Sequence, residues 1–296
     1  MKNCTRFVGL DDSKHSIDVA VASEGRDGEV RSYGPISNTP EAVRKLVRRL
    51  GRPKDLYFVY EAGPCGYGLY RELLALGANC MVAAPSKTPR RSDDRIKTDR
   101  RDALALARLH RAGELQPVWV LDEETEAMRD LTRAREDAKY VQTKARQRLQ
   151  SFLLRHGRRY PGRSSWTKMH LRWLAEQRFA QPSQQICLDE YVGAVEQATA
   201  RVQRLEDQIR ELVSVWSLGP VVSAMTAHRG VSLVVAATVC AELGDLTRFD
   251  RARALMGFVG LVPSLHGTGL SHRVGAITKT GNSHVRRVLV EAAWSY

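Results

Sequence analysis

The order of strand and helix patterns in residues 1–118 constrains the fold of this chain more than any other feature. Apolar runs on either side of a polar break at Asp12 to His15 predict two strands joined by a turn within residues 6–23. Thr39 and Pro40 at its start and Gly51 at its end predict the first helix. The other patterns predict strands at 29–38, 55–63 and 79–85 and helices at 67–77 and 98–113.

Three strands before the first helix, and regular alternation after it, predict a mixed α/β sheet with the strand order of a ribonuclease-H-like domain. In that order the first and fourth strands are neighbours. A dinucleotide-binding fold is excluded, because the first strand is followed neither by a helix nor by a G-x-G-x-x-G turn.

Residues 119–217 are predicted to form a helical coiled-coil region with long helical patterns at 122–157 and 185–216. In the second pattern, apolar residues recur at alternating steps of three and four, as in a coiled-coil seam. The seam comprises Val195, Ala198, Val202, Leu205, Ile209, Leu212 and Trp216. Two interpretations stay open: the seam packs against a helix of the same chain, or it forms a dimer interface.

Residues 218–296 are predicted to form a third, mainly helical domain. A loop and a helix are expected within 228–246, and a cationic turn leads into a helix that starts near Asn282 or Ser283. The 296 residues are thus expected to divide into regions at 1–118, 119–217 and 218–296.

The charge balance favours a nucleic-acid partner. Lysine and arginine total 46 against 33 acids, a net charge of +13, and cations that neutralise phosphates release counterions. No basic helix has the aromatic-rich apolar face of a membrane-surface helix. No apolar run approaches the roughly 20 residues of a membrane span, and no signal peptide is evident, so we expect a cytoplasmic protein without a membrane partner. The scattered cysteines lack zinc or disulfide spacing.

Basic residues are concentrated at 133–172, which holds twelve lysines or arginines and two acids. Tyr160, Trp166 and His170 are interleaved with them. A solvated surface normally mixes charges of both signs, so we expect a nucleic-acid contact there. The residues selected are Arg146, Arg148, Arg158 and Arg159.

Four carboxylates are candidates for one metal site. Asp11 and Glu61 end the first and fourth predicted strands, while Asp99 and Asp102 share one face of the next helix. Converging carboxylates repel one another unless a cation neutralises them, and oxygen ligands suit Mg²⁺ or Mn²⁺. In the other open interpretation, Asp99 and Asp102 only neutralise arginines on a solvated helix face.

Two further acids compete for this role. Asp12 is left out because it is expected on the opposite face of its strand from Asp11, and Asp18 is not selected. Basic residues around the second acidic pair are expected to hold the nucleic-acid backbone: Arg95, Lys97, Arg100 and Arg101.

Five segments carry a resemblance to a known family: GLDDSK, YEAGPCGYGLYREL, DRIKTDRRDALALARL, LVPSLHGTG and ITKTGNSHVRRVLVEAAW. Together, in this order and along nearly the whole chain, they resemble the DEDD-type insertion-sequence transposases. The resemblance implies a resolvase-like N-terminal domain and a C-terminal transposase domain with a catalytic serine. It also implies assembly as dimers or tetramers and, in related members, guidance by a bridge RNA. The acidic tetrad carries over to Asp11, Glu61, Asp99 and Asp102.

This chain departs from the family at the serine. Members similar to it read S-S-G or S-T-G where this chain has Gly267, Thr268 and Gly269, so the position of the nucleophile matches Thr268. A threonine hydroxyl can attack phosphorus, although its extra methyl group fits less well. The alternatives are that Ser271 or Ser264 substitutes, or that this copy is impaired. His266 and His272 flank the motif as candidate proton carriers.

The sequence therefore predicts a metal-dependent recombinase that cuts and rejoins DNA at insertion-sequence ends and targets, guided by an RNA. Two alternatives are a resolvase-like nuclease that uses water and a non-catalytic remnant that binds RNA or DNA. Candidate strand-holding residues in the C-terminal region are Arg273, Lys279, Arg286 and Arg287.

Overall fold

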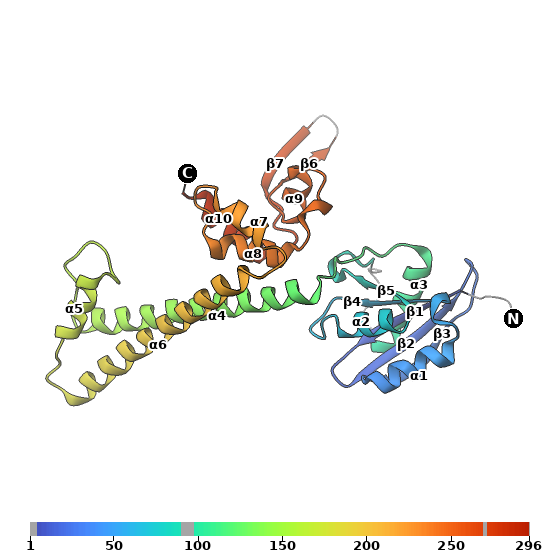
Figure 1. Ribbon diagram of the computed structural model, residues 1–296, viewed down its shortest axis with the longest axis horizontal. Coiled ribbons are helices and arrows are strands. Elements are labelled where there is room, and N and C mark those ends of the chain that lie inside the picture. Colours follow the sequence, from blue (N-terminus) through green and yellow to red (C-terminus); the bar gives the residue numbers. More distant parts are fainter. Residues whose placement is uncertain (1–4, 90–97, 269–270, 296) are drawn as a thin grey trace. The chain divides into compact units, whose positions relative to one another are not determined.

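The computed structural model describes residues 5–89, 98–268 and 271–295. The chain divides into two compact units, residues 1–120 and 121–296, and each is described by itself. The predicted boundary at 217/218 falls inside the second unit, so the three-part division stays a prediction. Figure 1 labels the helices and strands.

The first unit is built on a five-stranded mixed sheet in the order β3-β2-β1-β4-β5. The strands are β1 (Arg6–Asp12), β2 (Ser16–Ser23), β3 (Val30–Ser37), β4 (Leu56–Glu61) and β5 (Asn79–Ala83). Strands β1, β2 and β3 pair antiparallel, whereas β4 pairs parallel with β1 and β5 parallel with β4. The predicted mixed sheet, with its first and fourth strands as neighbours, is confirmed.

Helices cover both faces of this sheet. They are α1 (Pro40–Leu50), α2 (Gly68–Ala75) and α3 (Asp99–Ala112), with short 3₁₀ turns at Pro53–Asp55 and Pro85–Lys87. Thr39 and Thr98 cap α1 and α3 through their hydroxyl oxygens, as threonine does at helix starts. Val8 and Leu10 of β1 share an apolar core with α1 and α2, while Phe7 packs with alanines of α3 on the other face. The faces alternate because successive side chains of a strand point in opposite directions.

Gly9 allows α3 to approach the sheet closely. A Cβ at this position would overlap the carbonyl oxygen of Ala103 and the amide nitrogen of Ala107, both backbone atoms of α3. Backbone atoms cannot move aside as a flexible side chain can, so only glycine fits between β1 and this helix. The contact fixes the distance between α3 and the sheet.

The second unit begins with two long helices, α4 (Glu123–Arg155) and α6 (Pro182–Val213), and the shorter α5 (Lys168–Glu176) between them. Met128 near the start of α4 shares a core with Ile209 near the end of α6, whereas Phe152 near the end of α4 shares one with Leu188 near the start of α6. The two helices are therefore antiparallel, and Figure 1 shows them side by side.

The predicted seam of α6 packs within the chain. Val195, Ala198, Val202, Ile209 and Trp216 are buried, Leu205 is half-buried and Leu212 is exposed. The buried members of α6 therefore pack within the chain, where α4 is the partner of this helix, and a dimer interface stays a prediction. The regular spacing breaks near its end, where Val213 is buried in place of Leu212.

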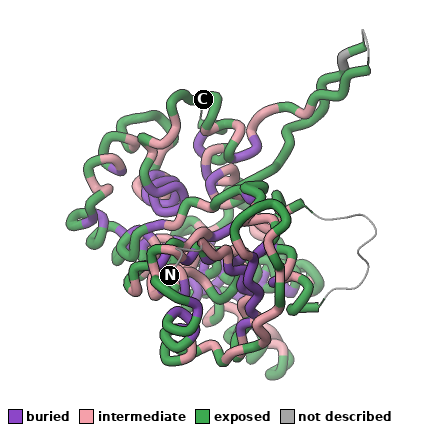
Figure 2. The backbone as a smooth tube through the Cα atoms, turned by 90° about the vertical axis from the view of Figure 1, so that its right-hand side faces the viewer, coloured by how far each residue is buried: buried purple, intermediate pink, exposed green. Residues whose placement is uncertain are grey.

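The remaining elements are α7 (Gly219–Thr226), α8 (Leu233–Leu243), a 3₁₀ turn at Leu246–Arg248, α9 (Ala252–Phe258), β6 (Pro263–Thr268), β7 (Ser271–Ile277) and α10 (Ser283–Ala293). Helix α10 starts where predicted, because the side chain of Asn282 accepts from the amide of Val285. The strands β6 and β7 form an antiparallel hairpin that the sequence patterns did not predict. Figure 2 shows this hairpin as an exposed projection.

Among the helices of the described residues, none is both long enough and apolar enough to cross a bilayer.

Substitution of Gly9 by alanine is expected to lower the free energy of unfolding by about 1–3 kcal/mol, because a Cβ forces α3 away from β1. Urea denaturation followed by circular dichroism measures this loss. Gly68→Ala is the matched control, since Gly68 has open space around its Cβ position and no left-handed φ. Equal stabilities for the two variants would contradict the role given to Gly9.

Candidate active site

Asp11 and Glu61 lie at the same edge of the sheet and on the same face. The parallel register of β1 and β4 runs to the pair Leu10 and Tyr60, and Asp11 and Glu61 are the next residue of each strand. Gly9 and Val59, two residues earlier, both pack against α3. Since side chains alternate along a strand, both carboxylates are on the face that α3 covers.

Helix α3 runs antiparallel to β1. Its Ala103 lies against Gly9, and the ring of His110 meets the ring of Phe7 edge-on with centroids 5.5 Å apart. Moving along α3 toward its N-terminus therefore means moving along β1 toward its C-terminus. The start of α3 is at the sheet edge where Asp11 ends its strand.

Along the direction of β1, Asp99 of α3 is close to the level of Asp11, and Asp102 lies between the levels of Gly9 and Asp11. Asp99 precedes Ala103 by about 6 Å along the helix axis, and Asp11 follows Gly9 by about 6.6 Å along the strand. Asp102 is one turn before the buried Leu106 and is half-buried, whereas Asp99 is exposed. The four predicted carboxylates thus share one end and one face of the sheet. Among the described residues, however, no three acidic, histidine or cysteine side chains form a ready-made metal site.

Asp18 adds a fifth carboxylate that the sequence analysis did not select. It pairs directly with Asp11 across β1 and β2, so the two side chains are on the same face. Val19 and Ala20, the next two residues, face different cores, and this alternation is the signal that could have placed Asp18 on the face of Ala20. Like charges directly opposite in a sheet are unfavourable, and a bound cation would relieve them. The oxygen-only donor set at this edge fits a hard divalent ion.

Asp12 lies on the other face, as predicted. Its Oδ1 accepts a hydrogen bond of 2.8 Å from Nδ2 of Asn38, which also donates to the carbonyl of Ser13 at 2.7 Å. Burial raises the pKa of Asp12, and hydrogen bonds from Cys65 and Asn38 partly offset that effect. Asn38 therefore ties β1 to the end of β3 and holds the turn that follows Asp11.

The basic residues predicted around α3 are only partly described. Arg100 and Arg101 are exposed in the first turn of α3, whereas Arg95 and Lys97 lie outside the described residues. The acids Asp99 and Asp102 in the same turn also interact favourably with the positive end of the helix dipole.

The predicted nucleic-acid contacts near the C-terminal end of α4, and in the segment that follows it, have different surroundings. The guanidinium of Arg146 lies 4.7 Å from the ring centroid of Trp166, and burial lowers its pKa. Arg158 donates to the carbonyl of Arg178 at 3.0 Å and covers the ring of Phe179. Arg148 and Arg159 are exposed. The interleaved aromatic residues Tyr160, Trp166 and His170 pack together, with His170 buried among them.

Thr268 is the last residue of β6, at the exposed end of the hairpin, and pairs with Ser271. Arg273 and Lys279 are exposed, and Lys279 has a left-handed φ of 55° in the turn before α10. Gly281 has a φ of 70°, and a Cβ there would overlap the carbonyl oxygen of Phe258. The turn between β7 and α10 is thus held closely against the end of α9.

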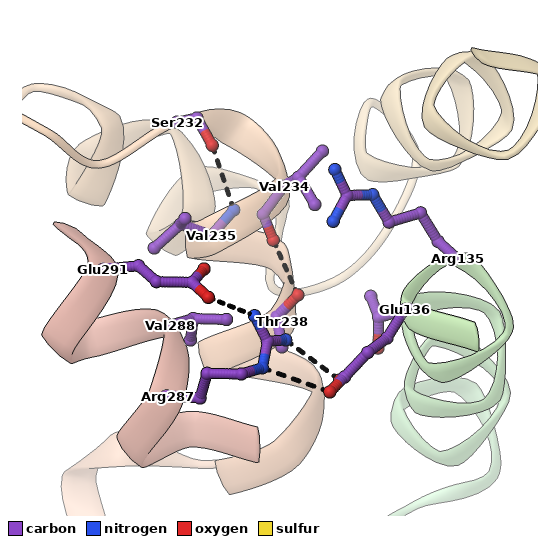
Figure 3. A pocket seen from close by; sticks show the side chains of 10 residues that line it. Arg135, Glu136, Ser232, Val234, Val235, Thr238, Arg287, Val288 and Glu291 are labelled. Carbon is purple, nitrogen blue, oxygen red and sulfur yellow. Dashed lines mark hydrogen bonds and ion pairs between the residues drawn. The ribbon is translucent and has the colours of Figure 1, made fainter. Parts of the chain in front are cut away.

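Arg286 and Arg287 make contacts inside the second unit. Arg286 donates to the carbonyls of Val259 at 2.7 Å and Thr280 at 2.8 Å. Arg287 lies between Glu136 of α4, at 3.0 Å, and Glu291 of its own helix, at 2.8 Å (Figure 3). The contacts of Arg287 with Glu136 and Glu291 border a cavity of about 180 Å³ between α4, α8 and α10. A structural role therefore accompanies the nucleic-acid role, which stays a prediction.

Two glutamates link α4, α8 and α10. Glu242 of α8, whose side chain is 1% exposed, accepts from Arg133 at 2.6 and 2.9 Å and from Asn282 at 2.7 Å. Burial alone would raise the pKa of Glu242, but the hydrogen bonds from Arg133 and Asn282 hold it below its usual value. Glu136 accepts from His284 at 2.8 Å, and its pKa is lowered too, since bonds from His284 and Arg287 outweigh burial.

Comparisons with known proteins match this chain to one class of protein. A family model of DEDD transposases covers residues 8–157, and one described as transposase of the IS116/IS110/IS902 family covers residues 222–296. The protein y4qE of Sinorhizobium fredii, named as a transposase, is 49% identical over 98% of this chain and 71% of its own length. The transposase for insertion sequence element IS1533 of Leptospira borgpetersenii is 30% identical over 98% of this chain and 85% of its own.

A solved structure, T. thermophilus RuvC in complex with a Holliday junction substrate, matches 38% of this chain and all of its own at 12% identity. The TM-score of this match is 0.25.

The class of protein is thus a transposase, an enzyme class that acts on DNA. This chain belongs to the IS110 family of DEDD transposases.

The stability of the second unit is expected to fall as the pH drops below about 4.5, the ordinary value for a glutamate. The pKa values of Glu242 and Glu136 are lower in the folded than in the unfolded protein. The ionised carboxylates therefore stabilise the folded state above pH 4.5, and this stabilisation is lost as the pH falls through the folded-state pKa values. Glu242→Gln is expected to cost about 1–3 kcal/mol at pH 7 and to flatten this dependence. Thermal unfolding from pH 7 to 3 measures both effects. The exposed Glu196→Gln is the control, and parallel curves for wild type and Glu242→Gln would contradict the assignment.

Proposed function

We propose that this transposase cuts and rejoins DNA phosphodiesters at the ends and targets of its insertion sequence. In this proposal, Asp11, Glu61, Asp99 and Asp102 hold Mg²⁺ or Mn²⁺, a hydroxyl of the β6–β7 hairpin attacks phosphorus, and a structured RNA guides the choice of DNA. The observation that carries the proposal is the common position of the four carboxylates at one end and one face of the sheet.

The acidic residues have distinct tasks in this proposal. Asp11, next to the last residue of β1, and Glu61, the last residue of β4, are fixed by their strands and provide the rigid part of the ion-binding edge. Asp102 and Asp99 approach from α3, whose distance from β1 is limited by Gly9. The bound ion would supply positive charge to the phosphate oxygens. Arg100 and Arg101, in the same first turn of α3 as Asp99 and Asp102, would hold the nucleic-acid backbone.

Thr268 is the proposed nucleophile among three hydroxyl groups of the hairpin. Ser264 lies against Gly275, four residues back along β6 from Thr268. Ser271 faces Thr268 directly across the hairpin, so it reaches the same part of a substrate. The family resemblance favours the position of Thr268, and Ser271 is the nearest substitute.

RNA guidance and assembly as a dimer or tetramer are also part of the proposal. The net charge of +13 and the exposed Arg148 and Arg159 are suited to a polyanion as well as to the DNA substrate. The carboxylates belong to the first unit and the hairpin to the second, and the proposed chemistry uses groups from both.

Strand exchange on element-end DNA, with co-purified RNA retained, is expected to need both the carboxylates of the sheet and the hydroxyl of the hairpin. Asp102→Asn removes an ion ligand and Thr268→Ala removes the attacking oxygen, so each should reduce exchange by at least 100-fold. Thr268→Ser should retain activity. The measurements are exchange products and a covalent protein–DNA adduct on suicide DNA. Asp27→Asn and Thr226→Ala, both exposed and outside the proposed site, are the controls.

Each other outcome points to a different function. Cleavage that requires Asp102 but yields no adduct in any variant would replace the proposal with a nuclease that uses water. Activity only in Thr268→Ser would mean an impaired copy. Metal-independent binding without cleavage would mean a nucleic-acid-binding remnant.

The proposed RNA contact at Arg148 of α4 and at Arg159, which follows this helix, predicts a weaker salt dependence of RNA binding in charge variants. Replacing both Arg148 and Arg159 by alanine should reduce the slope of log K against log salt for the co-purified RNA by about 1–2, because each phosphate contact contributes nearly one. Filter binding between 50 and 300 mM salt would measure it. Arg210→Ala removes an exposed arginine that pairs with Asp207 and serves as the control. An unchanged slope in the double variant would remove these residues from the RNA surface.

A further inference from the structure

The two faces of the β6–β7 hairpin carry different chemistry. Its register pairs Thr268 with Ser271, His266 with Arg273, and Leu265 with Val274. Residues that face each other across an antiparallel pair share a face, and residues two apart on one strand share it as well. Thr268, Ser271, His266 and Arg273 therefore lie on one face, and Leu265 and Val274 on the other.

The polar face is continuous from the end of the hairpin toward its base. Ser264, two residues before His266, contacts the position of Gly275, two residues after Arg273. This contact places Ser264 on the polar face at the point where the register of the hairpin shifts, between Pro263 and Leu265. On the opposite face, Leu265 is 73% and Val274 65% exposed, and neither side chain can transfer a proton.

Spacing on the polar face suits proton transfer. His266 and Thr268 are separated by about 6.6 Å along the strand, a distance that an imidazole spans directly or through one water. Arg273, opposite His266, is within about 5.5 Å at the Cβ atoms. In the described part of the hairpin, Arg273 is the charged group that faces His266, and Thr268, Ser271 and Ser264 are its hydroxyl neighbours.

We propose that His266 is the general base for the hydroxyl of Thr268 and that Arg273 binds the phosphate under attack. This inference rests on the proposed function, in which Thr268 is the nucleophile. An imidazole is suited to the task because it gains and loses a proton between about pH 5 and 8. A guanidinium beside it offers two parallel hydrogen bonds to the non-bridging oxygens.

The proposed attack transfers one proton and replaces one bond to phosphorus by another. A ring nitrogen of His266 accepts the hydroxyl proton of Thr268 while Oγ1 forms a bond to phosphorus. The bond from phosphorus to one strand end breaks, and the leaving oxygen takes a proton from water, which leaves a hydroxide. In rejoining, a strand hydroxyl attacks the phosphorus of the phosphothreonine and gives its proton to that hydroxide. The bond from phosphorus to Oγ1 breaks, and the imidazolium returns its proton to the departing Oγ1.

The test measures the rate of covalent adduct formation on suicide DNA by the full chain from pH 5 to 9. The wild-type rate should rise with pH, because only an unprotonated imidazole can accept the hydroxyl proton of Thr268. His266→Gln should lower the rate at pH 7.5 by roughly 100- to 10,000-fold and remove this rise. Arg273→Ala should lower the rate but keep the rise. Added imidazole should partly restore His266→Ala, an effect that a purely structural role would not produce.

The exposed His228→Gln is the matched control and should behave as wild type. A His266→Gln variant that keeps the wild-type rate and pH profile would overturn the role of His266 alone, leaving Thr268 as nucleophile. The absence of an adduct from the wild-type chain at every pH would overturn both the proposed function and this inference.

Discussion

The backbone contact between α3 and β1 at Gly9 governs the arrangement of the first unit. A sheet strand and a helix normally stand apart by the depth of their side chains, but here the absence of a Cβ lets the carbonyl of Ala103 approach the strand itself. The helix direction is then fixed by the contact of His110 with Phe7. Because of these two contacts, the acidic first turn of α3 lies at the edge where β1 and β4 end.

The second unit depends on charged contacts between its helices as well as on close backbone approaches such as that at Gly281. Glu242 and Glu136 each accept hydrogen bonds from cationic side chains, and together they join α4, α8 and α10. Such pairs are stabilising only when every partner is present, since a lone buried carboxylate is strongly unfavourable. Asn282 has two tasks, because it caps α10 and donates to Glu242. The position of α10, and of the turn that connects it to the hairpin, therefore depends on α4.

The charge of a residue in the sequence does not reveal whether its side chain is exposed or contacts other groups of the same unit. Arg286 and Arg287 stand in a cationic segment, yet their guanidinium groups contact carbonyl oxygens and carboxylates of the same unit. Arg148 and Arg159 belong to an equally basic segment and are exposed. The difference arises from elements far apart along the chain, since Glu136 precedes Arg287 by about half the length of the protein.

The sequence by itself determined the local elements and the strand order, because capping residues such as Thr39, Thr98 and Asn282 and the apolar periodicities act over a few residues. It also carried the family, through motifs spread over both units. It did not predict the β6–β7 hairpin, whose exposed, glycine-containing strands lack a buried apolar face. Only the tertiary structure placed Asp18 beside Asp11 and Arg273 opposite His266, because strand register sets which side chains of different strands meet.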